Sequence, residues 1–112
     1  MQPLTSTQAK YLRGLAHGLR PVVFVGQKGV TAAVLDSVSE ALGVHELIKV
    51  KLVEFKQRGQ KSAIAAAIEE KADCGLAGLI GNVAIFYRPH PDHEKRKIKI
   101  PPRLNRPIPQ NR

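Results

Sequence analysis

A short apolar segment, Val22–Val25, leads directly into Gly26-Gln27-Lys28-Gly29 and then into residues with helical spacing. The apolar run is too short for a helix and is flanked by turn residues, which predicts a strand buried in the interior of a sheet. Apolar residues then recur every three or four positions from Val30 to Leu42, and Gly43 is expected to end that helix. A strand, a two-glycine turn and a helix in this order favour an α/β architecture.

The rest of the chain continues the alternation of helices and strands. A Thr5–Gln8 capping box and later helical spacing predict an amphipathic helix over residues 6–17. Further elements are expected as a strand over 45–53, a helix over 60–73, and strands over 76–80 and 83–88 joined by a Gly81-Asn82 turn. The order helix, strand, helix, strand, helix, strand, strand predicts parallel strands, with only the last hairpin antiparallel.

Two of these elements carry finer predictions. In the last strand, period-two alternation places Val83, Ile85 and Tyr87 on one face and Ala84 and Phe86 on the other. In the third helix Gly75 is the expected C-cap, and the expected inward residues are Ala63, Ile64, Ala67, Ile68 and Ala72.

Positive charge is concentrated toward the C-terminus. The 112 residues carry 18 Lys and Arg against 9 Asp and Glu, a formal net charge of +9. Such an excess attracts polyanions, of which nucleic acid is the commonest for a basic domain, with an anionic membrane as the next alternative. Residues 89–112 hold six of the eight prolines and most of the positive excess. We therefore predict a domain over 1–88 and a flexible, disordered basic tail over 89–112.

The two-glycine turn has the chemistry of a phosphate-binding loop. Glycine lacks a Cβ atom, so the backbone of Gly26 and Gly29 can turn tightly and approach a sugar-phosphate chain. The N-terminus of the following helix favours an anion, and Lys28 adds a mobile positive charge. KH domains clamp nucleic acid with a Gly-x-x-Gly loop of this kind. A turn with two glycines is also common in proteins without such a function.

Basic residues of the first helix form a second candidate surface. Lys10, Arg13, His17 and Arg20 follow one another at helical spacing, on a different stripe from the apolar positions. This stripe is either an anion-facing ridge or an ordinary solvated helix face. Lys49 projects from the expected second strand on the face opposite its apolar residues.

Several functional classes find no support in the residue patterns. No G-x-x-x-x-G-K-[ST] or G-x-G-x-x-G motif is present, so neither a Walker-type site nor a dinucleotide fingerprint is expected. Cys74 is the single cysteine, and His90 with His93 lies in the Pro-rich region, so no metal site, catalytic group or cofactor is predicted. His45-Glu46 is dismissed as an acid–base pair because neighbours on a strand face opposite ways. The chain has no secretory signal and no membrane-spanning run, so a cytoplasmic location is expected.

Several segments together resemble a known family. Pro21–Thr31, then His45–Lys51, then Ile80-Gly81 and Tyr87-Arg88-Pro89 are similar in order and spacing to the chloroplast RNA splicing and ribosome maturation (CRM) domain. The chain most resembles its stand-alone bacterial form, the YhbY type, over about residues 4–90. The resemblance implies a two-layer α/β fold with a four-stranded mixed sheet, like the C-terminal domain of a bacterial translation initiation factor. It also implies association with precursors of the large ribosomal subunit.

The resemblance also implies which residues contact RNA. It makes Gly26, Gln27, Lys28 and Gly29 the RNA-facing loop. Many family members have Lys at the first variable position, whereas here Gln27 stands there and Lys28 carries the charge. The full predicted RNA-binding set is Gly26, Gln27, Lys28, Gly29, Lys10, Arg13, Arg20, Lys49 and Arg88.

Two functional hypotheses follow. The first is a monomeric, non-enzymatic protein that binds structured RNA, with ribosomal RNA as the expected partner and no membrane or small-molecule substrate. The low aromatic content favours recognition by shape and phosphate rather than by stacked bases. The alternative is an adaptor that docks on a ribosomal protein through its apolar hairpin or its tail. DNA competes with RNA on charge alone, and only the resemblance favours RNA.

Overall fold

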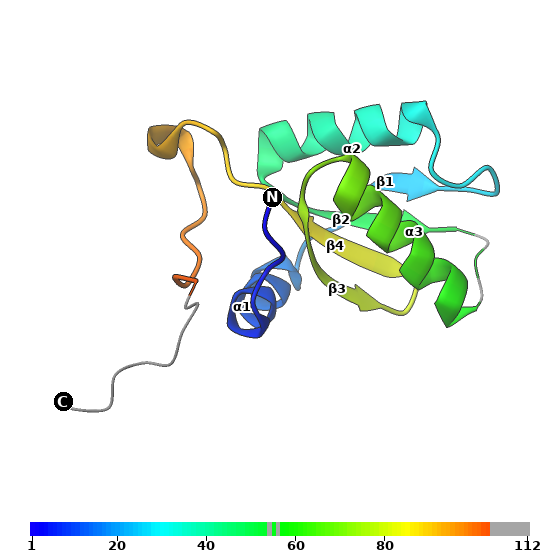
Figure 1. Cartoon of the computed structure of the whole chain (residues 1–112), viewed down its shortest axis with the longest axis horizontal. Helices are drawn as coiled ribbons and strands as arrows, with labels where there is room; N and C mark the ends of the chain where they lie inside the picture. The colour runs from blue at the N-terminus through cyan, green and yellow to red at the C-terminus, as the bar shows by residue number, and fades with distance from the viewer. Residues whose placement is uncertain (54, 56, 104–112) are drawn as a thin grey trace.

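A computed structural model describes residues 1–53, 55 and 57–103 of the chain. Three helices and four strands alternate along it, followed by a short 3-10 helix (Figure 1). The elements are α1 (Ser6–Ala16), β1 (Pro21–Val25), α2 (Ala32–His45), β2 (Leu47–Leu52), α3 (Arg58–Lys71), β3 (Gly75–Ile80), β4 (Val83–Tyr87) and η1 (His93–Lys95). The predicted α/β class and element order are confirmed. In the described part of the chain, no helix is long and apolar enough to cross a membrane.

The four strands form one mixed sheet in the order β1-β2-β4-β3. β1 and β2 pair in parallel, whereas β4 pairs antiparallel with both β2 and β3. The prediction that only the last hairpin is antiparallel is therefore wrong, because β4 lies between β2 and β3 and adds a second antiparallel pairing. Local patterns along the chain do not specify which strands become neighbours.

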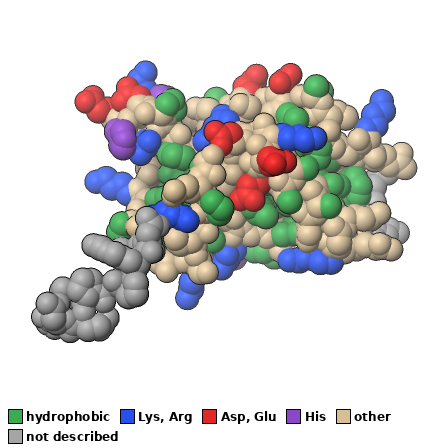
Figure 2. Space-filling model, viewed as in Figure 1, with side chains coloured by type: hydrophobic (Ala, Val, Ile, Leu, Met, Phe, Trp, Pro, Cys, Tyr) green, Lys and Arg blue, Asp and Glu red, His purple; other side chains and the backbone are tan. Residues whose placement is uncertain are grey.

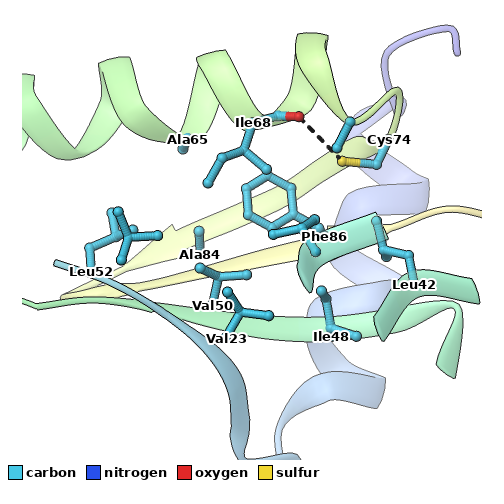
Figure 3. Packing of buried hydrophobic residues seen from close by; sticks show 13 residues of the cluster. Val23, Leu42, Ile48, Val50, Leu52, Ala65, Ile68, Cys74, Ala84 and Phe86 are labelled. Carbon is cyan, nitrogen blue, oxygen red and sulfur yellow. Dashed lines mark hydrogen bonds between the residues drawn. The ribbon is translucent and has the colours of Figure 1, made fainter. Parts of the chain in front are cut away.

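The main core lies between the sheet and the two helices α2 and α3. Figure 3 shows side chains from the helices α2 and α3 and from the strands β1, β2 and β4 meeting there, with the Phe86 ring beside Ile68 and Cys74. The Sγ of Cys74 lies 3.8 Å from the Ile68 carbonyl oxygen, and burial raises the pKa of this thiol to about 12. A thiol that stays protonated at neutral pH is a poor nucleophile, so Cys74 acts as a small core residue.

A second, smaller core lies on the opposite face of the sheet, beneath α1. Leu12 and Ala16 of α1 pack there against Ile85 and Tyr87 of β4. Thr5 and Gln8 form the predicted capping box, with each side chain accepting from the other residue's backbone N–H. Ala84 and Phe86 belong to the main core, so the predicted division of β4 into two faces is confirmed.

β1 is an edge strand, and the prediction of a wholly buried interior strand is wrong. Val23 and Val25 point into the main core, but 48% of Val22 and 58% of Phe24 are exposed. An apolar run without polar alternation resembles a central strand, although here only one of its faces is covered. The exposed face of β1 therefore needs an explanation other than packing.

The bounds of α2 and α3 differ from the predicted ones. α2 begins at Ala32, after the N-cap Thr31, and continues through Gly43 to His45. α3 begins at Arg58 and is followed by Asp73, whose φ of 51° turns the chain, so Gly75 opens β3 instead of capping the helix. Ala63 is exposed and Ala65 is buried in the core in its place.

The start of the predicted tail packs on the domain, so the expectation of disorder is wrong for residues 89–103. The carboxylate of Glu46 is buried and accepts hydrogen bonds from the backbone N–H groups of His90, Lys97 and Ile98 at 2.8, 2.7 and 3.1 Å. Ile98 and Ile100 pack against the smaller core. The expectation for residues 104–112 falls outside the described part of the chain.

Candidate nucleic-acid interface

Residues 26–29 form a tight, exposed turn at the end of β1. The N–H of Gly29 donates to the Gly26 carbonyl oxygen at 2.9 Å, which closes the turn. Gly29 has a φ of +72°, a conformation that favours glycine over residues with a Cβ atom. A Cβ added at Gly26 or Gly29 would meet no atom within 4 Å, so the outer side of the turn is open to a ligand. Gln27 and Lys28 stand exposed at its tip.

The turn does not lead directly into the helix, as the sequence suggested. Val30 and Thr31 intervene, and the Thr31 hydroxyl accepts from the N–H of Val34 at 3.1 Å. The first turn of α2 contains no acidic residue. The partial positive charge at the N-terminus of α2 therefore lies next to the loop, and no carboxylate in the first helical turn opposes it.

Acidic residues are unevenly distributed over the domain. In the described part of residues 1–88, every acidic side chain belongs to α2, α3 or the turns that follow them. Figure 2 views the molecule from the side of α2 and α3, where several Asp and Glu side chains are visible. The sequences of α1 and of the four strands contain no Asp or Glu. The face that carries α1 is therefore the favourable one for a polyanion.

Three of the predicted basic residues lie near or on this face. Lys10 of α1 and Arg20, just before β1, are exposed. Lys49 of β2 is partly buried, and its Nζ donates to the His17 carbonyl oxygen at 3.3 Å, beside the C-terminal end of α1. A lysine in that position also offsets the negative end of the helix dipole.

The guanidinium groups of Arg13 and Arg88 bind the protein's own backbone. Arg13 donates to the Ala77 carbonyl oxygen at 2.8 Å and thereby joins α1 to β3. Arg88 donates to the carbonyl oxygens of Ala72 at 2.9 Å and Ser39 at 2.8 Å, so it ties the end of α3 to α2. Both side chains have a structural role that the charge pattern did not reveal.

The predicted set therefore does not form one cluster. The loop lies at the C-terminal end of β1, whereas Arg20 lies at the N-terminal end of that strand. Arg88 follows the C-terminal end of β4, and because β4 runs antiparallel to β2, this end of the sheet is the one near Arg20. At about 3.3 Å per residue the loop and Arg20 stand roughly 20 Å apart. An extended polyanion can contact both, but a single phosphate cannot.

Sequence reasoning missed Lys51 and Phe24 as surface candidates. Lys51 is exposed on β2 and pairs in register with Phe24 of β1. The alternation of Ile48, Val50 and Leu52 with lysines was the signal for Lys51. For Phe24 no such signal exists, because its run appears uniformly apolar.

The described residues contain no group of three or more His, Cys, Asp or Glu side chains placed to hold a metal ion. His45 ends α2 and Glu46 is its C-cap, with a φ of 63°. The predicted strand at these two positions therefore begins later, at Leu47, and Glu46 is a buried structural carboxylate.

The chain is similar to several known proteins. The family model of the CRS1/YhbY (CRM) domain matches residues 4–88. A Haemophilus influenzae protein named as an RNA-binding protein is 41% identical over 101 residues, 90% of this chain and 98% of that protein. YqeI of Bacillus subtilis, which also has RNA binding in its name, is 33% identical over 98 residues, 88% of this chain and 99% of that protein.

A solved structure resembles the fold as a whole. The solution structure of SAV1595 from Staphylococcus aureus, described as a candidate RNA-binding protein, superposes with a TM-score of 0.75. The two sequences are 28% identical, and the match covers 88% of this chain and 99% of that one. With the family match over residues 4–88, the chain belongs to the CRS1/YhbY (CRM) domain family.

Proposed function

We propose that this chain is a cytoplasmic, monomeric RNA-binding protein without enzymatic activity, which associates with ribosomal RNA precursors and assists maturation of the large subunit. RNA as the partner is supported by the family and by the names of its relatives. The ribosomal role rests on the resemblance to the CRM domain. In this proposal the loop 26–29 grips the phosphate backbone.

One observation carries the proposal furthest: an open Gly-x-x-Gly turn with Lys28 at its tip stands at the end of a sheet whose strands, like α1, contain no Asp or Glu. Backbone groups and Lys28 can approach a phosphate there, and the first turn of α2 contains no carboxylate that would repel it. Lys10, Arg20, Lys49 and Lys51 extend the positive surface from this turn toward α1. Recognition by shape and phosphate follows from such a surface.

The salt dependence of binding tests whether RNA is held through its phosphates. If about six phosphates are neutralised, log K should fall against log salt with a slope of roughly −4 to −5. Fluorescence anisotropy with labelled RNA hairpins at several KCl concentrations measures this slope. A nearly flat dependence would rule out the proposed mode of binding.

A substitution in the loop tests the loop itself. Gly29→Asp is expected to weaken RNA binding by about 10-fold or more, because the new carboxylate repels phosphate at the point of closest approach. The φ of +72° at Gly29 strains any residue with a Cβ atom, but Asp tolerates this conformation better than most residues and its Cβ meets open space. The free energy of unfolding should therefore fall by no more than about 1–2 kcal/mol.

Gly29→Asn is the matched control for that experiment. Asn has nearly the same shape and the same tolerance for a positive φ as Asp, but no charge. It should keep most of the affinity that Gly29→Asp loses. Equal affinities of the wild type and the Gly29→Asp protein would show that the loop does not contact RNA.

The alternative, an adaptor for a ribosomal protein, is favoured by one feature. An apolar groove of about 430 Å³ is lined by Leu15 and Leu19 near the end of α1, by Val22 of β1 and by Leu47 of β2. Recovery of the protein from cell extract with and without ribonuclease discriminates the two functions. An adaptor stays with its partner after the RNA is digested, whereas an RNA-binding protein is released.

A further inference from the structure

A row of four side chains crosses the sheet at the end where the loop 26–29 lies. Phe24 of β1 pairs with Lys51 of β2, Lys51 with Val83 of β4, and Val83 with Ile80 of β3. Their pattern of exposure and the alternation of the strands place these residues on the α1 side of the sheet. We call Phe24, Lys51, Val83 and Ile80 the open sheet face.

Helix α1 does not cover this row. Its buried residues pack against Leu47, Ala77, Ile85 and Tyr87, which lie toward the other end of the strands. Figure 1 shows α1 at the opposite end of the molecule from the β1–α2 loop. As a result 58% of Phe24 and 60% of Ile80 are exposed, while Phe86 is fully buried on the other face.

The backbone holds this end of the sheet in place. The N–H of Val53 donates to the Val25 carbonyl oxygen at 2.8 Å, and the N–H of Leu52 donates to the Asn82 carbonyl oxygen at 2.7 Å. Phe24 is therefore an aromatic ring on a fixed strand, two residues before the loop that carries Lys28. An exposed aromatic on an edge strand favours aggregation unless a partner covers it.

We propose that the open sheet face binds an unpaired nucleotide of the RNA, with its base stacked on Phe24 and its phosphate beside Lys51 and Lys28. This inference rests on the proposed function and adds a subsite to it. The positive charges favour a nucleotide over an apolar protein surface as the ligand of this face. Lys51 lies beside Phe24 on the neighbouring strand, and Lys28 lies on the adjacent loop. Stacking tolerates any base, so the subsite is compatible with recognition by shape.

The test compares two RNA probes and two substitutions in the full chain. The probes are a short blunt RNA duplex and the same duplex with a single-stranded uridine extension. Phe24→Leu keeps an apolar side chain but removes the ring, and Phe24→Tyr keeps the ring. Phe24→Leu should lower the affinity for the extended probe by about 5- to 100-fold and leave the blunt duplex unaffected. Phe24→Tyr should retain the affinity of the wild type for both probes.

Further controls separate stacking from folding and from other apolar contacts. Val44→Ala changes another exposed apolar side chain, 55% exposed on α2, and should bind both probes as the wild type does. Thermal unfolding of all variants should be nearly unchanged, because each altered side chain is largely exposed. A fluorescent purine analogue in the extension should be quenched by the wild type and by Phe24→Tyr but not by Phe24→Leu.

The possible failures are distinguishable. If the blunt duplex binds with the expected salt dependence but Phe24→Leu binds the extended probe as the wild type does, the stacking subsite is wrong and the proposed function stands. If Phe24→Leu weakens both probes equally, the ring is a general contact and the subsite is also overturned. If neither probe binds, the proposed function itself fails. If sedimentation shows a dimer that Phe24→Leu dissociates, the face joins two copies of the chain instead.

Discussion

Replacing Phe86 with alanine is expected to lower the free energy of unfolding by about 3–5 kcal/mol. The ring is fully buried and lies between α3 and the sheet, beside Ile68 and Cys74 (Figure 3). Its removal takes a large apolar group out of the core and leaves a cavity that the surrounding helices and strands fill only in part. Since whole domains have about 5–15 kcal/mol of stability, this one substitution removes a large share. Urea unfolding followed by circular dichroism measures the change.

Ile80→Ala is the control for the loss of apolar volume alone. Ile80 lies on the strand next to β4, but 60% of it is exposed, so the same kind of truncation should cost no more than about 0.5 kcal/mol. Similar losses for Phe86→Ala and Ile80→Ala would contradict the assignment of the main core to the α2 and α3 side of the sheet.

The second large effect is expected at Glu46. Glu46→Ala should cost about 2–4 kcal/mol, because the buried carboxylate accepts three backbone N–H groups and hydrogen bonds to a charged group are the strong ones. The loss of stability is limited because residues 90–98 can detach from the domain. Their backbone N–H groups then bond to water instead of staying buried without an acceptor. Amide hydrogen exchange at His90, Lys97 and Ile98 should then become about 30-fold faster or more.

Two further variants separate the effect of the Glu46 carboxylate from the effect of the strained backbone conformation at this position. Glu46 has a φ of 63°, and alanine retains the strain of that conformation whereas glycine relieves it. Glu46→Gly should therefore be somewhat more stable than Glu46→Ala yet show the same rapid exchange of the three amides. Glu40→Ala, at an exposed position of the same helix, should leave exchange unchanged. Unchanged protection in Glu46→Ala would show that the carboxylate does not anchor the C-terminal segment.

The local elements of the fold were predictable because each depends on neighbouring residues. The Thr5–Gln8 capping box, the two faces of β4 and the turn at Gly81 follow from spacing within a few positions. The sheet order was not predictable, since the position of β4 depends on pairing with β2, more than thirty residues earlier in the chain. The anchoring role of Glu46 was missed for the same reason: its three hydrogen-bond donors are 44 to 52 residues away.

The candidate site was predictable as a loop but not as a surface. The Gly-x-x-Gly turn is a local motif, and its exposed position at the end of β1 agrees with the prediction. Arg13 and Arg88 have the same charge in the sequence as Lys10 and Arg20, but their guanidinium groups bind backbone carbonyl oxygens. The exposure of Phe24 depends on how far α1 extends over the sheet, which no pattern within β1 records.

The central position of β4 has a consequence for synthesis of the protein. β4 is the last strand to be translated, yet it is the one that joins β2 to β3. A nascent chain that ends before Val83 has β1 and β2 available but leaves β2 and β3 with unpaired edges, which are the features that promote aggregation. The sheet can therefore be completed only after nearly the whole domain has been translated. Cooperative folding of the sheet is then a single late step.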